Sequence, residues 1–107
     1  MMEDQLVEAC EVGDLETVKQ LVEQGADIHA CHNRPLRFAC ANNNLHIVKY
    51  LLESGADINT RYGGFLDIVC ELDFLSMVKY LVTHGASTVN IDASGYSEEI
   101  VNYLNFR

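Results

Sequence analysis

The chain has 107 residues, 49% of them hydrophobic, and a formal net charge of −9 at pH 7. This length suits one small domain, and the acidic balance excludes the basic surface that nucleic-acid-binding proteins carry. No run of about 18 apolar residues predicts a membrane span, and the acidic N-terminus lacks the basic and apolar regions of a signal peptide.

The first predicted elements are two short helices joined by a turn. Residues 6–10 form the apolar part of the first helix, and residues 12–14 (Val-Gly-Asp) are typical of a turn. The second helical pattern starts at Leu15 and ends at Gly25, because glycine adopts the left-handed conformation at a helix end without steric cost. Residues 26–34 then start extended and end polar, so we expect this connector to project as a finger.

The same arrangement occurs twice more, and each copy follows the last by 30 residues. The apolar pattern of the first helix, which starts at Leu6, starts again at Leu36 and Leu66. The pattern of the second helix, which starts at Leu15, starts again at Leu45 and Leu75. A period of this length predicts stacked units, because no unit can bury its apolar face alone. The last predicted helix, residues 97–106, takes the place of a fourth unit's first helix and should cap the stack.

Two motifs of the repeat resemble a known family. The segment from Gly55 to Asn59 (Gly-Ala-Asp-Ile-Asn) resembles the motif that follows a helix in ankyrin repeats, and residues 35–40 match the family's Thr-Pro-Leu-His-x-Ala-Ala motif in part. The resemblance covers roughly residues 4–106 and implies an all-α repeat solenoid, an ankyrin-like stack of helix-turn-helix units with short finger loops or hairpins. The implied single domain, residues 1–107, holds three repeats at about 4–33, 34–63 and 64–93, and a C-terminal capping helix at about 97–106.

The repeat is shorter than is usual for this family. Ankyrin units have about 33 residues, whereas these units have 30. The missing residues fall between Gly25 and Pro35, so we expect the fingers to be short loops rather than full β-hairpins. Units of this length resemble those of ankyrin proteins from giant DNA viruses, which would imply the host cell's cytoplasm as the location of a viral chain.

The resemblance implies a non-catalytic protein–protein interaction module, an adaptor or an inhibitor without a cofactor. Partners of the family meet the fingers and the concave face of the first helices, so we expect a protein partner and neither a nucleic acid nor a membrane. The alternative is a structural scaffold or self-associating protein that uses the ends of the stack. The terminal helix favours this alternative, because Tyr103 and Phe106 make it more apolar than a capping element should be. We otherwise expect a monomer.

The candidate partner-binding residues lie where the repeat pattern is broken. Arg61 and Tyr62 are adjacent on the middle finger, and interface hot spots favour both residue types. Phe74 occupies a turn position where the other units have Asp14 and Asn44. These aromatic residues either form the centre of a binding surface or pack on the neighbouring unit, and the sequence leaves both alternatives open. The full set of candidates is Arg61, Tyr62, Leu72, Phe74, His32 and Asn42.

Three cysteines occupy one position in successive units: Cys10, Cys40 and Cys70. Neighbouring helices lie about 8–10 Å apart, whereas bridged cysteines need Cα atoms within about 7 Å, so we expect free core residues. Four reduced cysteines suit the cytosol and therefore a cytoplasmic location. The cluster from His29 to His32 (His-Ala-Cys-His) lacks the fourth ligand of a zinc site, so no metal site is predicted.

The sequence contains no catalytic constellation, so we expect no enzyme activity. The serines lie in turns without a patterned base, and the pair Gly63-Gly64 lacks the Lys-Ser/Thr of a phosphate-binding loop. One modification motif is present, because Leu51 and Asp57 precede Asn59 at the spacing that asparaginyl hydroxylases accept in ankyrin repeats. Asn59 is therefore a candidate hydroxylation site, although the same residues also belong to the ordinary ankyrin pattern.

Overall fold

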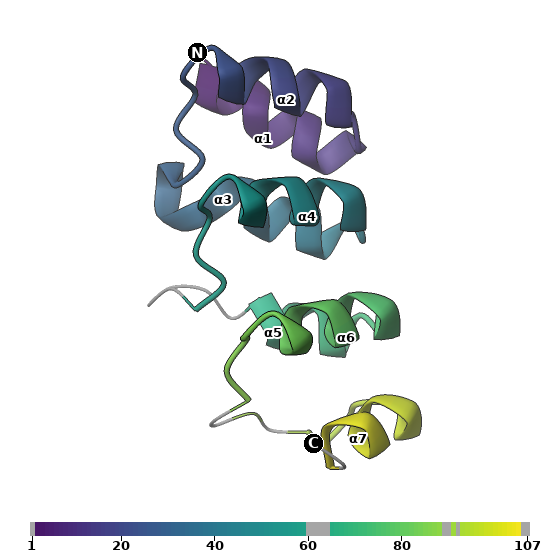
Figure 1. Ribbon diagram of the computed structural model, residues 1–107. Helices are drawn as coiled ribbons and strands as arrows, with labels where there is room; N and C mark the ends of the chain where they lie inside the picture. Colours follow the sequence, from purple (N-terminus) through teal and green to yellow (C-terminus); the bar gives the residue numbers. More distant parts are fainter. Residues whose placement is uncertain (1, 60–64, 89–90, 92, 106–107) are drawn as a thin grey trace.

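The computed structural model describes residues 2–59, 65–88, 91 and 93–105. Three helix pairs are stacked in chain order, and a seventh helix lies beyond the third pair (Figure 1). The described part of the chain contains no strand, which confirms the predicted all-α repeat solenoid. The helices are α1 (Met2–Val12), α2 (Leu15–Glu23), α3 (Ala30–Ala41), α4 (Leu45–Glu53), α5 (Phe65–Glu71), α6 (Leu75–Thr83) and α7 (Glu98–Asn105).

The stack is elongated, with principal extents of 41 × 23 × 19 Å. The first helices α1, α3 and α5 pack on one another in order along one side, and the second helices α2 and α4 contact each other on the other side, which faces the viewer in Figure 1. α7 packs against α6 and covers the C-terminal end of the stack. None of the helices in the described residues is both long and apolar enough to cross a membrane.

The core is a continuous strip that repeats with the units. Each first helix buries a leucine and, four residues later, a cysteine, because residues four apart share one face of a helix. The cysteines are free and buried, which confirms that they are core residues. These pairs are Leu6 and Cys10, Leu36 and Cys40, and Leu66 and Cys70, each residue at most 5% exposed.

The turn inside each helix pair passes through one residue with a left-handed backbone. Its φ is 87° at Gly13, 56° at Asn43 and 63° at Asp73. Glycine adopts this conformation freely, and Asn and Asp are the side chains that tolerate it best. This requirement explains why each turn carries a Gly, Asn or Asp at the same position of the unit.

The second helices start directly after these turns, and α2 has the most complete N-cap. The carboxylate of Asp14 accepts hydrogen bonds from the Thr17 backbone N–H (3.2 Å) and from the Thr17 hydroxyl (2.6 Å). These bonds favour the ionised form and lower the pKa of Asp14. At the equivalent position Asn44 instead donates from Nδ2 to the Cys10 carbonyl oxygen (2.6 Å), which ties the second unit to the first.

The first connector differs from the predicted finger. α3 begins at Ala30, so residues 30–33 form a helical turn where a projecting polar segment was expected. Asn33 has a φ of 65°, which interrupts the regular helix two residues before Pro35. Pro35 therefore lies in the first turn of the regular part of α3, where its missing N–H costs little. The middle finger, residues 60–64, lies outside the described residues. The boundaries of the three repeats stay a prediction.

Side chains at one position of the connectors join successive units. The Nε2–H of His29 donates to the carbonyl oxygen of Gly55 (3.1 Å). At the equivalent position in the next unit, Asn59 donates from Nδ2 to the Gly85 carbonyl oxygen (2.6 Å) and accepts from the Ser87 N–H (2.8 Å). These residues therefore hold each connector to the helix end of the following unit.

The second helices are joined by a row of cation–π contacts. In each contact a lysine ammonium lies within 6 Å of the centre of an aromatic ring on the next unit, which is the range of this attraction. The last contact extends the row to the capping helix α7. The pairs are Lys19 and Tyr50 (5.9 Å), Lys49 and Tyr80 (5.4 Å), and Lys79 and Tyr103 (5.8 Å).

Candidate functional site

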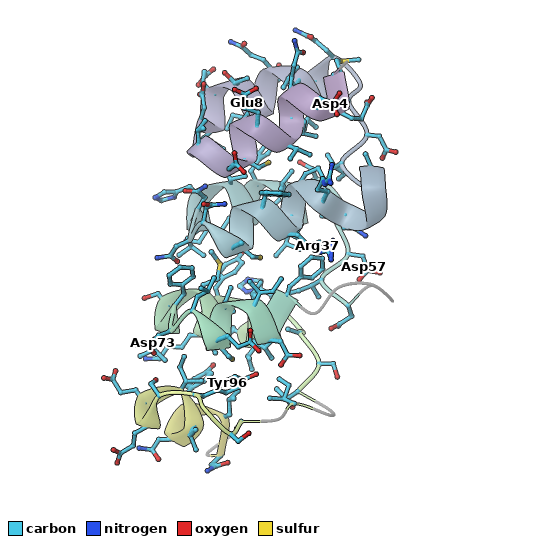
Figure 2. All side chains as sticks on the ribbon, turned by 180° about the vertical axis from the view of Figure 1, so that it is seen from behind. Asp4, Glu8, Arg37, Asp57, Asp73 and Tyr96 are labelled. Carbon is cyan, nitrogen blue, oxygen red and sulfur yellow. The ribbon has the colours of Figure 1, made fainter. Side chains whose placement is uncertain are left out.

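The exposed side of the first helices forms one continuous surface. α1, α3 and α5 lie side by side there, as Figure 2 shows from behind. The buried leucine and cysteine of each helix point inward, so the residues on the opposite side of each helix are exposed or half-buried. We call this surface the first-helix face and define it by Asp4, Glu8 and Glu11 on α1, Arg34, Arg37 and Phe38 on α3, and Asp67, Ile68 and Glu71 on α5.

The charge of the first-helix face changes sign from helix to helix. α1 presents three carboxylates, α3 presents two guanidinium groups, and α5 presents two carboxylates. Figure 2 shows Asp4 and Glu8 on α1 and Arg37 on the α5 side of α3. Neighbouring helices lie about 8–10 Å apart, so the three bands of charge are separated by about that distance.

The middle band combines arginine with an aromatic ring. The guanidinium of Arg34 lies 5.9 Å from the centre of the Phe38 ring. Arg37 is half-buried, and its guanidinium forms no ion pair or hydrogen bond within the described part of the chain. A half-buried arginine without a partner among the described residues can bind an anionic group from outside the protein.

The turns at the edge of this face carry exposed apolar side chains. Val12 is 69% exposed and Leu72 is 47% exposed, at the same position of the first and third units. Asn42 occupies this position in the second unit, where its Nδ2 donates to the Phe38 carbonyl oxygen (2.9 Å). The edge therefore adds an apolar margin to the charged first-helix face.

The repeat architecture agrees with a comparison against known protein families. Residues 6–93 match the family model of ankyrin repeats, in three copies. The chain belongs to the ankyrin-repeat family. Ankyrin repeats are generally protein–protein interaction modules and are typically not enzymes. No curated protein matches the chain.

The predicted partner-binding residues of this ankyrin domain are described only in part. Leu72 and Asn42 are exposed at the edge of the first-helix face. Phe74 is half-buried as the N-cap of α6 and packs against the core, the arrangement expected if it stabilises the neighbouring unit. That the six candidate residues together form a binding surface stays a prediction. Outside the described part of the chain lie Arg61, Tyr62 and the side chain of His32.

Two residues of the first-helix face, Arg37 and Phe38, were not among the sequence-based candidates. The sequence-based candidates lie on fingers and turns, where the ankyrin pattern is broken. A signal was present in the repeat itself, because the position of Arg37 holds Val7 in the first unit and Asp67 in the third. The change of sign belongs to the summed charge on the exposed side of each first helix and not to any single position of the repeat.

The candidate hydroxylation site Asn59 is held by hydrogen bonds on both its side chain and its backbone. Besides the side-chain bonds to the third unit, its backbone N–H donates to Oδ1 of Asp57 (2.9 Å). The residue is exposed, but an enzyme that takes its side chain into an active site must first break these bonds. Hydroxylation of Asn59 stays a prediction.

The buried thiols of this ankyrin stack are poor nucleophiles. Burial raises the pKa of Cys10 and Cys40 to about 12, and burial together with Asp67 and Glu71 raises the pKa of Cys70 to about 11. All three thiols are therefore protonated at neutral pH, whereas the thiolate is the reactive and metal-binding form. In the described residues, no three His, Cys, Asp or Glu side chains are placed to hold a metal ion.

Proposed function

We propose that the chain is a non-catalytic ankyrin module that binds one partner protein and acts as an adaptor or an inhibitor. It would bind through the first-helix face and the adjoining turns and fingers. The observation that carries this proposal is Arg37, a half-buried arginine near the middle of that face whose guanidinium has no partner in the described residues. Arginine is typical of interface hot spots, and a partner's carboxylate would supply the missing counter-charge.

The titratable groups of the core support binding rather than catalysis. The three buried thiols stay protonated at neutral pH. Burial, together with a hydrogen bond to Asp67 (2.7 Å), raises the pKa of Tyr96 well above its ordinary value. None of these groups is poised to exchange a proton near pH 7. Free, buried thiols also suit a reducing compartment, so we propose the cytoplasm as the location.

The N-terminal end of the stack supports a monomer rather than the alternative of a self-associating scaffold. A groove of about 330 Å³ at this end is lined in part by Gln5 and Thr17. The equivalent residues of the second unit, Pro35 and Ile47, are buried. The first unit thus carries polar residues where an inner unit carries apolar ones, which is the pattern of a solvent-facing end.

Affinity capture with three versions of the chain tests the proposed function. The wild type, a double variant of the first-helix face (Arg37→Ala with Phe38→Ala) and a control are immobilised and exposed to a cell lysate. The control carries Gln20→Ala and Gln24→Ala, two exposed positions at the second helix of the first unit. We expect mass spectrometry to find one protein retained by the wild type and the control and depleted at least tenfold with the double variant.

Circular dichroism must first show that all three versions are folded to the same extent. Equal retention of that protein by all three would contradict the proposed binding surface. If no protein is retained by the wild type above the level of an empty support, the proposed function itself fails. A fourth version, Arg61→Ala with Tyr62→Ala, shows whether the predicted finger residues contribute.

A further inference from the structure

The geometry points to a partner segment that is acidic at its centre, carries an apolar side chain beside the acid, and is basic on both sides. This inference rests on the proposed function and specifies the chemistry of the partner. The segment would cross α1, α3 and α5 in turn, so that each of its charges faces the opposite charge of one helix.

The band on α1 calls for basic groups on the partner. Glu8 and Glu11 are exposed, and within the described residues neither carboxylate forms an ion pair. Residues 1–33 contain eight acidic residues and Lys19 as their one base, so the first unit is strongly negative and supplies little positive charge of its own. Lysine or arginine side chains of a partner would be attracted to this end of the face.

The band on α3 calls for an acidic group next to an apolar one. Arg37 is half-buried, and a guanidinium in that position can donate two parallel hydrogen bonds to a carboxylate. Phe38 on α3 and Ile68 on α5 are half-buried apolar side chains of the same face. An aliphatic side chain of the partner can cover them while the neighbouring carboxylate binds Arg37.

The band on α5 restores the negative sign. Asp67 accepts a hydrogen bond from the Tyr96 hydroxyl (2.7 Å), which fixes the position of its carboxylate. Glu71 lies one helical turn further along α5 and is exposed. Because the bands alternate, a partner of uniform charge is repelled by at least one of them, and selectivity follows from that repulsion.

The spacing of the helices sets the spacing of the partner's charges. Adjacent bands lie about 8–10 Å apart, a distance that an extended segment spans with about three residues. The sequence Lys-Lys-Ser-Leu-Glu-Glu-Ser-Lys-Lys therefore represents the inferred order. A second peptide, Glu-Glu-Ser-Leu-Lys-Lys-Ser-Lys-Lys, has the same composition and net charge but places its acids at one end.

Fluorescence anisotropy with these two labelled peptides tests the inference at physiological salt. Three proteins are compared: the wild type, Arg37→Glu, and a control with Gln20→Glu and Gln24→Glu that has the same net charge as Arg37→Glu. We expect the wild type and the control to bind the peptide with central acids at least tenfold more tightly than the rearranged peptide. Arg37→Glu should lose this preference.

The inference is overturned if the wild type binds both peptides equally or binds neither. It is also overturned if folded Arg37→Glu, checked by circular dichroism together with Arg37→Ala, keeps the wild-type preference. These outcomes are distinguishable from a failure of the proposed function. A captured protein that depends on Arg37 and Phe38 would leave the module's binding role intact even if the peptide order had no effect.

Discussion

At the scale of the residue, glycine ends each second helix for a reason that can be measured. Gly55 has a φ of 106°, and an added Cβ would meet no atom within 4 Å, so the cost of a side chain comes from the backbone alone. We expect Gly55→Ala to lower the free energy of unfolding by about 1–2 kcal/mol in urea denaturation. The control is Ser54→Ala, because the preceding residue is exposed and has a φ of −87°. Equal effects of the two substitutions would contradict this explanation.

At the scale of the element, the row of lysine–tyrosine contacts should couple the second helices. The ammonium of Lys49 lies 5.4 Å from the ring centre of Tyr80 on the next unit. A double-mutant cycle with Lys49→Met and Tyr80→Leu should give a coupling free energy of about 0.5–1 kcal/mol. The cycle separates this contact from the stacking of Tyr80 on His84 (4.0 Å between ring centres).

The matched control for this cycle pairs Lys19 with Tyr80. These residues lie two units apart, so their coupling should be close to zero. A similar coupling in both cycles would mean that the effect is a general charge effect and not the ring contact.

At the scale of the whole molecule, the repeat period predicts the stack but not the details of its joints. The helical spacing of apolar residues from Leu45 and the glycine at position 55 predict α4, because helix periodicity and a left-handed helix end are local properties of the sequence. The early start of α3 at Ala30 was not predicted, since the helical turn at residues 30–33 depends on the left-handed backbone of Asn33 and not on a hydrophobic period. Arg37 was missed because its isolation and half-burial arise from three helices that only the fold brings together.

The same nearest-neighbour packing predicts how stability is distributed along the stack. Leu51 is fully buried in the second unit, whereas Leu21, at the equivalent position of the first unit, is 7% exposed and lines the groove at the N-terminal end. Leu51→Ala should lower the free energy of unfolding by about 2–5 kcal/mol, because it leaves a cavity between packed units. Leu21→Ala should cost less, since part of its surface faces an open groove instead of a neighbouring unit. Urea denaturation followed by circular dichroism compares the two variants, and equal losses would show that the end unit is held as firmly as the central one.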